Sequence, residues 1–140
     1  MTVLVTGGAG FIGANFILDW LSTRDEPIVN FDKLTYAGNL KSLSSILEND
    51  RYTFEQGDIA DTVKVADILA EFRPTAIVHF AAESHVDRSI YGPEDFIETN
   101  VLGTFRLLTT ARKYFEQLSH SEREAFRFIN VSTDEVYGES

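Results

Sequence analysis

Three glycines near the amino end have the spacing of a phosphate-binding loop. Gly7, Gly10 and Gly13 lie between an apolar run and a segment with helical periodicity. Gly7 would permit a tight turn, Gly10 would let the backbone approach a pyrophosphate, and Gly13 would let the helix pack closely on the strand. Because a helix N-terminus also offers free N–H donors and a partial positive charge, this segment predicts a dinucleotide site. The glycines alone leave open a glycine-rich turn without a ligand.

A carboxylate at the end of the next apolar run strengthens this prediction. Asp32 lies 19 residues after Gly13, where its oxygens can accept hydrogen bonds from both hydroxyls of an adenine ribose. Such charge-assisted bonds contribute roughly 1.5–3 kcal/mol each. The same carboxylate would repel a 2′-phosphate, so we expect NAD to be preferred over NADP. Lys33 works against this preference, because a cation beside Asp32 could accept a phosphate.

Two later segments could extend the site. Asp58 follows a third apolar run, where its carboxylate could bond an adenine amino group. A turn-forming or helix-capping aspartate has the same spacing. Ala81 and Ala82 end a fourth apolar run, and small residues there would let a cofactor lie flat against the sheet edge or would simply pack.

A hydroxyl and two carboxylates follow the last apolar run. Thr133, Asp134 and Glu135 are adjacent in the chain. Adjacent carboxylates push each other's pKa values apart, so one can hold a proton while the other acts as a base. The cluster is suited to acid–base catalysis, and a capped turn leading into another element fits the same residues.

The histidine-containing segments give no prediction of a metal site. Glu83, His85 and Asp87 alternate and would share one face of an extended segment. We nevertheless expect no metal, since an acidic loop with one histidine is usually solvated or hydrogen-bonded. His79 lies within an apolar run and is interpreted as a core histidine with satisfied hydrogen bonds. His120 lies in a polar segment that is interpreted as a loop and suggests no function.

Strands and helices must alternate along the chain to position these segments. We expect strands at 2–6, 28–32, 52–56, 75–82 and 127–132, and helices at 11–21, 40–47, 62–72 and 93–118. Asp61 would cap the third helix. The fourth helix would carry an apolar stripe at Ile97, Val101, Phe105, Leu108, Ala111 and Phe115.

This alternation predicts an α/β fold built on a doubly wound parallel sheet. Near-continuous apolar strands are typical of a parallel sheet with helices on both faces. Right-handed crossovers then favour five strands in the order 3-2-1-4-5, the arrangement of a Rossmann fold. Ligands bind such a sheet outside the carboxyl ends of its strands, and the candidate segments fall there.

Composition limits the classes of function. The chain has 140 residues, which fits one domain, and its 44% hydrophobic content fits a globular protein. Its formal net charge is -10, so nucleic acid is not an expected partner. The absence of cysteine excludes disulfides and thiolate catalysis. Short apolar runs predict no membrane helix, and a strand that begins at Thr2 predicts no targeting peptide and a cytoplasmic location.

Four segments together resemble one family. The segment TGGAGFIG (6–13) is similar to the opening of the extended short-chain dehydrogenase/reductases. The segments DKLTYAGNL (32–40), HFAAESHVDRS (79–89) and STDEVYG (132–138) narrow the resemblance to the dTDP-glucose 4,6-dehydratases. The resemblance implies that residues 1–140 are the N-terminal part of an NAD-binding Rossmann domain. The substrate domain would be absent and the sheet incomplete on its C-terminal side.

The resemblance implies a lyase that uses bound NAD without consuming it. The substrate dTDP-glucose would be oxidised at C4, lose water across C5–C6 and regain the hydride at C6, which gives dTDP-4-keto-6-deoxyglucose. Glu135 would be the base at C5, and Asp134 would protonate the departing C6 hydroxyl. Thr133 would hydrogen-bond the sugar near C4, and Ser84 would touch both cofactor and substrate.

The resemblance also implies further cofactor contacts. Phe11 and Ile12 would donate backbone N–H groups to the pyrophosphate, and Asp58 and Ile59 would lie at the adenine. Contacts are likewise implied for Lys33, Leu34, Thr35, Phe80, Ala81, Ala82, Glu83, Ser84 and Thr99.

The sequence departs from the family pattern at one point. The family carries a Tyr-x-x-x-Lys pair whose tyrosine removes the C4 hydroxyl proton, and none of the five tyrosines here is followed by a lysine four positions later. We therefore expect the 140 residues alone to be inactive. A stand-alone, non-catalytic NAD-binding module and a related sugar-nucleotide 4-epimerase are the alternatives. An epimerase would need no acid–base pair such as Asp134 and Glu135 to eliminate water.

The predicted edge of the sheet favours self-association. The strand at 127–132 would carry Phe128, Ile129 and Val131 on an unpaired edge, which can template pairing with another chain. The helix at 93–118 offers a second surface, because members of the family commonly dimerise through helices on this side. We expect a homo-oligomer.

Overall fold

Five parallel strands form the centre of the fold. The computed structural model describes residues 1–7, 11–33, 39–46, 48–80 and 93–131, with the side chains at 11, 39–42 and 93–100 excepted. The strands pair side by side in the order β3-β2-β1-β4-β5, and every pairing is parallel. This confirms the predicted doubly wound sheet. The strands are β1 (Val3–Thr6), β2 (Ile28–Asp32), β3 (Tyr52–Gln56), β4 (Ala76–Phe80) and β5 (Arg127–Val131).

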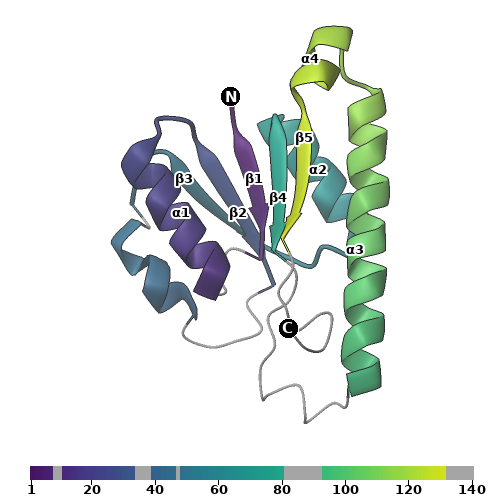
Figure 1. The fold of residues 1–140 in the computed structure, drawn as a ribbon, viewed down its shortest axis with the longest axis horizontal. Coiled ribbons are helices and arrows are strands. Elements are labelled where there is room, and N and C mark those ends of the chain that lie inside the picture. The colour runs from purple at the N-terminus through teal and green to yellow at the C-terminus, as the bar shows by residue number, and fades with distance from the viewer. Residues whose placement is uncertain (8–10, 34–38, 47, 81–92, 132–140) are drawn as a thin grey trace.

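Helices cover both faces of the sheet (Figure 1). The helix α1 (Phe11–Thr23) and the 3-10 helix η1 (Asn39–Ile46) pack on one face, and α2 (Thr62–Phe72) and α3 (Pro93–Glu116) pack on the other. Successive side chains of a strand point to opposite faces, so each strand contributes to two cores. In β1, for example, Val3 and Val5 join the α1 core, whereas Leu4 joins the α2–α3 core.

The ends of α2 agree with their sequence signals. Asp61 is the N-cap, and its side chain accepts a hydrogen bond from the backbone N–H of Lys64. At the other end Arg73 adopts a left-handed conformation with φ 48°, and its N–H donates to the carbonyl of Leu69. Pro74 follows and cannot continue the helix. The predicted bounds of this helix are confirmed.

The buried face of α3 differs from the predicted apolar stripe. Leu107, Ala111 and Tyr114 are buried, whereas Phe105 and Leu108 are 64% and 45% exposed. The stripe prediction is therefore correct at Ala111 and wrong at Phe105, at Leu108 and at Val101, which is 63% exposed. Both faces of this helix carry apolar side chains, so apolar spacing by itself could not identify the face that meets the sheet.

The buried face of α3 makes a close contact with the segment between β3 and α2. Gly103 lies on this face, and a Cβ added to it would lie 3.2 Å from the side chain of Ile59. A helix can approach its neighbour closely where its residues are small, and the resulting density of contacts favours that face.

Two short helical segments differ from the prediction. The segment predicted as a helix at 40–47 is the 3-10 helix η1. A further helix, α4 (His120–Ala125), joins α3 to β5, so His120 begins a helix and does not lie in a loop. The Ser119 hydroxyl accepts from the backbone N–H of Glu122, whose side chain accepts from the backbone N–H of Ser119. This capping box, Ser-x-x-Glu, was readable in the sequence.

Within the described ranges, no helix has both the length and the apolar content that a membrane crossing requires.

Candidate dinucleotide-binding site

Position 7, directly after β1, accommodates only glycine. Gly7 has φ +78°, and its N–H donates to the carbonyl of Phe31 over 3.2 Å. A Cβ added at Gly7 would lie 2.6 Å from the carbonyl oxygen of Phe80, at the end of β4. Both the backbone conformation and this close approach exclude a side chain. Gly7 thus has the backbone conformation that the predicted tight turn requires, and residues 8–10 lie outside the described part of the chain.

The helix that follows this turn presents its amino end at the carboxyl edge of the sheet (Figure 1). α1 begins at Phe11 and has no acidic residue in its first turn. Ile12 is 40% exposed there, and Gly13 is buried. The N–H groups of a first helical turn lack partners within the helix, and the helix dipole adds a partial positive charge, so an anion is favoured at this position.

Asp32 and Lys33 lie at the end of β2, at the same edge. Asp32 is partly exposed, and its carbonyl accepts a hydrogen bond from the N–H of Gly57 over 3.0 Å. Lys33 Nζ lies 3.4 Å from Asp58 Oδ2, with the two side chains 55% and 42% exposed. An exposed pair of this kind contributes only about 0–1 kcal/mol to stability. The pair nevertheless places the Asp58 carboxylate next to the Lys33 ammonium group, which is the group that could accept a 2′-phosphate.

Asp58 also organises the turn between β3 and α2. Its Oδ1 accepts from the backbone N–H of Ala60 over 2.9 Å, and its carbonyl accepts from the N–H of Asp61 over the same distance. The turn-forming interpretation of Asp58 is therefore confirmed. Its contact with an adenine stays a prediction.

The side chains of Ile59 and Phe80 pack in the cores on the two faces of the sheet. Ile59 packs against the core beneath α2 and α3, next to Gly103. Phe80 is 9% exposed, and its ring centroid lies 5.6 Å from that of Phe16 in α1. A ligand contact at Phe80 would therefore come from the backbone, whereas Ile59 is only partly buried.

His79 is a buried histidine with both ring nitrogens hydrogen-bonded, as the sequence predicted. Its side chain is 4% exposed, and burial lowers its pKa to about 4 because the charged form loses its hydration. The partners are Thr6, whose Oγ1 lies 2.6 Å from Nδ1, and Thr104, whose Oγ1 lies 3.1 Å from Nε2. Neither threonine was singled out from the sequence, because the contacts depend on which strands and helices become neighbours.

The remaining predicted residues lie outside the described part of the chain, and their roles stay predictions. In the phosphate loop and after β2 these are Gly10, Leu34 and Thr35. After β4 and β5 they are Ala81, Ala82, Glu83, Ser84, Thr133, Asp134 and Glu135, together with the alternating Glu83, His85 and Asp87. For Phe11 and Thr99 the structure describes the helix backbone and not the side chain.

Comparison with known proteins extends this description. Residues 4–140 match the protein family described as GDP-mannose 4,6 dehydratase. The chain is 57% identical over 139 residues to the dTDP-glucose 4,6-dehydratase of Escherichia coli, which covers 99% of this chain and 38% of that protein. The crystal structure of the dTDP-glucose 4,6-dehydratase from Streptomyces venezuelae, which has NAD bound, matches with a TM-score of 0.79 and 45% identity. That match covers 99% of this chain and 41% of the other.

A more distant match comes from a related class of enzyme. The UDP-Glc/GlcNAc 4-epimerase of Campylobacter jejuni matches with a TM-score of 0.75 and 28% identity, over 98% of this chain and 38% of that chain. The chain thus spans between 38% and 41% of the length of these three proteins. The same fold serves both classes, and the higher identity lies with the dehydratases.

Proposed function

The chain belongs to the GDP-mannose 4,6 dehydratase family, and we propose that it is the NAD-binding portion of a dTDP-glucose 4,6-dehydratase. The observation that carries the proposal is the 57% identity to such an enzyme over 99% of this chain. The chain covers only 38% of the length of that relative. We therefore propose the complete reaction for a full-length protein that contains these residues. Residues 1–140 would form the N-terminal part of the NAD-binding domain.

The described residues at the carboxyl edge fit NAD. Gly7 leaves the turn without a side chain, and the first turn of α1 has no acidic residue to repel a pyrophosphate. Asp32 would accept hydrogen bonds from the adenine-ribose hydroxyls, and Asp58, which lies next to Lys33, would offset the attraction of that cation for a 2′-phosphate. When bound, NAD would take up a hydride from the sugar and return it. These features favour NAD over NADP.

Residues of this chain would act as the base and the acid of the elimination. Glu135 would remove the proton at C5, which is acidified once C4 is a ketone. Asp134 would protonate the departing C6 hydroxyl, and Thr133 would hydrogen-bond the sugar near C4. Ser84 would contact both cofactor and substrate. These assignments follow from the motifs STDEVYG and HFAAES.

The 140 residues alone are proposed to bind NAD without turnover. They contain no tyrosine followed by lysine four positions later, so the base for C4 oxidation is not among them. Loss of a positioned general base typically costs about 10²–10⁴-fold in rate. The elimination cannot begin before that oxidation, because only the ketone acidifies the C5 proton.

Mass spectrometry of the sugar nucleotide tests the function. A full-length protein that carries these residues should convert dTDP-glucose to a product lighter by one water. Deuterium placed at C4 of the substrate should appear at C6 of the product. A product of unchanged mass, with an inverted C4 seen in its proton NMR coupling constants, would indicate the 4-epimerase alternative. NAD binding with no conversion of dTDP-glucose would indicate the non-catalytic module.

We also propose that the protein is a homo-oligomer. Val101, Leu102, Phe105 and Leu108 of α3 are 63%, 44%, 64% and 45% exposed, which leaves an apolar surface on the outer side of this helix. On β5, Ile129 is 48% exposed. Analytical ultracentrifugation at micromolar concentration should detect association, and Phe105→Glu should weaken it. A stable monomer would contradict the proposal.

A further inference from the structure

A buried histidine joins three elements at the carboxyl end of the sheet. His79 of β4 is 4% exposed, and Thr6 of β1 is fully buried. His79 Nδ1 is hydrogen-bonded to Thr6 Oγ1 over 2.6 Å, and His79 Nε2 is hydrogen-bonded to Thr104 Oγ1 of α3 over 3.1 Å. Thr6 and His79 are register partners in the β1–β4 pairing, so the chain of hydrogen bonds crosses two strands and then reaches the helix above them.

These hydrogen bonds fix the orientation of the His79 ring and of the two threonine hydroxyls, which apolar packing would not do. A neutral imidazole has one N–H donor and one acceptor nitrogen, while a threonine hydroxyl can play either role. One threonine must therefore donate to the ring and the other must accept from it. A buried polar group that loses its partner is costly, so the ring holds both hydroxyls in place. An aliphatic side chain at position 79 would fill the space without coupling the strand to the helix.

Two of these three hydrogen-bonded residues directly precede a residue of the proposed NAD site, and the third lies on a helix that carries one. Thr6 directly precedes Gly7, where an added Cβ would lie 2.6 Å from the carbonyl of Phe80. His79 directly precedes Phe80. Thr104 lies on α3, the helix that also carries Thr99. A small shift between β1 and β4, or between β4 and α3, would therefore change the spacing of the positions that are to hold the cofactor.

We propose that Thr6, His79 and Thr104 form a positioning network that sets the spacing of β1, β4 and α3 for cofactor binding. The inference rests on the proposed NAD site and extends it to three residues outside the set of candidate cofactor contacts. A site whose elements are held in the bound arrangement before binding loses less free energy when the ligand binds. The network thus acts on NAD affinity in addition to its contribution to stability.

A matched set of variants on α3 tests the network. Thr104→Val removes the hydroxyl that meets His79 and preserves the shape of the side chain, and Thr104→Ser restores the hydroxyl. Thr110→Val is the control, because Thr110 is a buried threonine of the same helix whose hydroxyl donates to the carbonyl of Arg106 within the helix. Thr6→Val and Thr6→Ser repeat the test from the strand side.

The measurements are the dissociation constant of NAD by calorimetry at 25 °C and the unfolding midpoint in urea. We expect Thr104→Val and Thr6→Val to weaken NAD binding by about fivefold, which is the effect of one lost hydrogen bond. Both serine variants should bind within about twofold of the wild type, and Thr110→Val should lower the midpoint without changing the dissociation constant.

The possible results separate the network from the site it serves. If the wild type does not bind NAD, the proposed function fails. If the wild type binds NAD and both valine variants bind equally well, the network has only a structural role and the inference is overturned. Weak binding by the serine variants would also overturn it, because the hydroxyl would not be the cause. If Thr6→Val does not fold, the comparison of Thr104→Val with Thr104→Ser tests the inference.

Discussion

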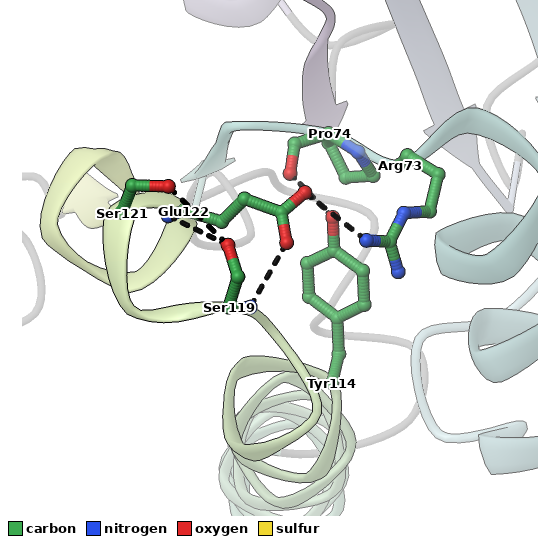
Figure 2. A network of polar contacts seen from close by, with 6 residues as sticks. All are labelled: Arg73, Pro74, Tyr114, Ser119, Ser121 and Glu122. Atoms are coloured by element: carbon green, nitrogen blue, oxygen red, sulfur yellow. Dashed lines mark hydrogen bonds and ion pairs between the residues drawn. The ribbon is translucent and has the colours of Figure 1, made fainter.

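The two ends of the sheet use their polar side chains for different purposes. At the amino end, the Tyr114 hydroxyl donates to the carbonyl of Pro74 over 2.6 Å, and Arg73 lies 3.2 Å from Glu122 (Figure 2). These contacts tie the end of α2 to α3 and α4. At the carboxyl end, Gly7 leaves a turn without a side chain, and Asp32 is partly exposed.

The difference indicates a division between stability and ligand binding. Polar groups at the amino end satisfy one another and the backbone, so their main effect is on the free energy of unfolding. The carboxyl end carries an anion-favouring helix terminus and partly exposed carboxylates, which are features of a site that receives a ligand. His79 lies at the carboxyl end and is buried. By the inference above, it affects both the free energy of unfolding and the affinity for NAD. Substitutions at the two ends should therefore separate stability from NAD affinity.

The largest effect is expected from Gly7→Ala, which should damage both properties at the carboxyl end. The new Cβ would lie 2.6 Å from the carbonyl of Phe80, in a backbone conformation with φ +78°. We expect a loss of about 3 kcal/mol in stability, measured by urea unfolding, and at least tenfold weaker NAD binding. In the control Gly103→Ala the Cβ meets only the flexible side chain of Ile59, so stability should change by about 1 kcal/mol or less. Equal effects of the two substitutions would contradict the comparison.

The buried histidine should make stability depend on pH. The pKa of His79 is lowered from 6.5 to about 4 in the folded protein. Between these values the unfolded chain binds a proton that the folded chain does not, so stability is fully present above pH 6.5 and is lost as the pH falls toward 4. The expected loss is about 3 kcal/mol.

The variant His79→Gln isolates this effect, since the carboxylates titrate in both proteins. Stability of the wild type and the variant should be measured by urea unfolding from pH 7 to pH 4. The wild type should lose about 3 kcal/mol more than the variant over this range. Parallel curves would show that His79 is not buried as a neutral ring.

Asp32→Ala should weaken the binding of the cofactor. The substitution removes the expected bonds to the ribose hydroxyls, so NAD binding should weaken by about 2 kcal/mol, close to thirtyfold. The preference for NAD over NADP should shrink at the same time. The control Asp61→Ala removes the N-cap of α2 and should lower stability by about 1 kcal/mol with no change in NAD affinity. Calorimetry with both cofactors and urea unfolding give the two readouts.

The smallest effect is expected from Tyr114→Phe, at the amino end. Loss of the hydroxyl leaves the carbonyl of Pro74 without this donor, and stability should fall by about 1 kcal/mol. NAD affinity should stay within the error of the measurement, because the contact lies at the opposite end of the sheet from Gly7 and Asp32. A clear change in NAD affinity would show that the two ends are coupled.

Local signals in the sequence predicted most of the fold. Asp61 and Pro74 gave the bounds of α2, because a cap and a helix breaker act on residues within one turn. The alternation of apolar strands with helical segments gave the order of the sheet, since right-handed crossovers leave few arrangements. The capping box of Ser119 and Glu122 was an equally local signal, and α4 could have been predicted from it. The glycines and Asp32 located the candidate site at the ends of β1 and β2.

Contacts between distant elements were decided by the tertiary structure. His79 meets Thr6 and Thr104, which are 73 and 25 residues away along the chain, and Lys33 meets Asp58 from the end of a neighbouring strand. Apolar spacing also did not identify the buried face of α3, which is the face on which Gly103 lies close to Ile59. A residue type and its spacing determine what a side chain can do within its own turn or strand. Its partner across the fold depends on strand register and helix packing, which are set by the shape of the whole core.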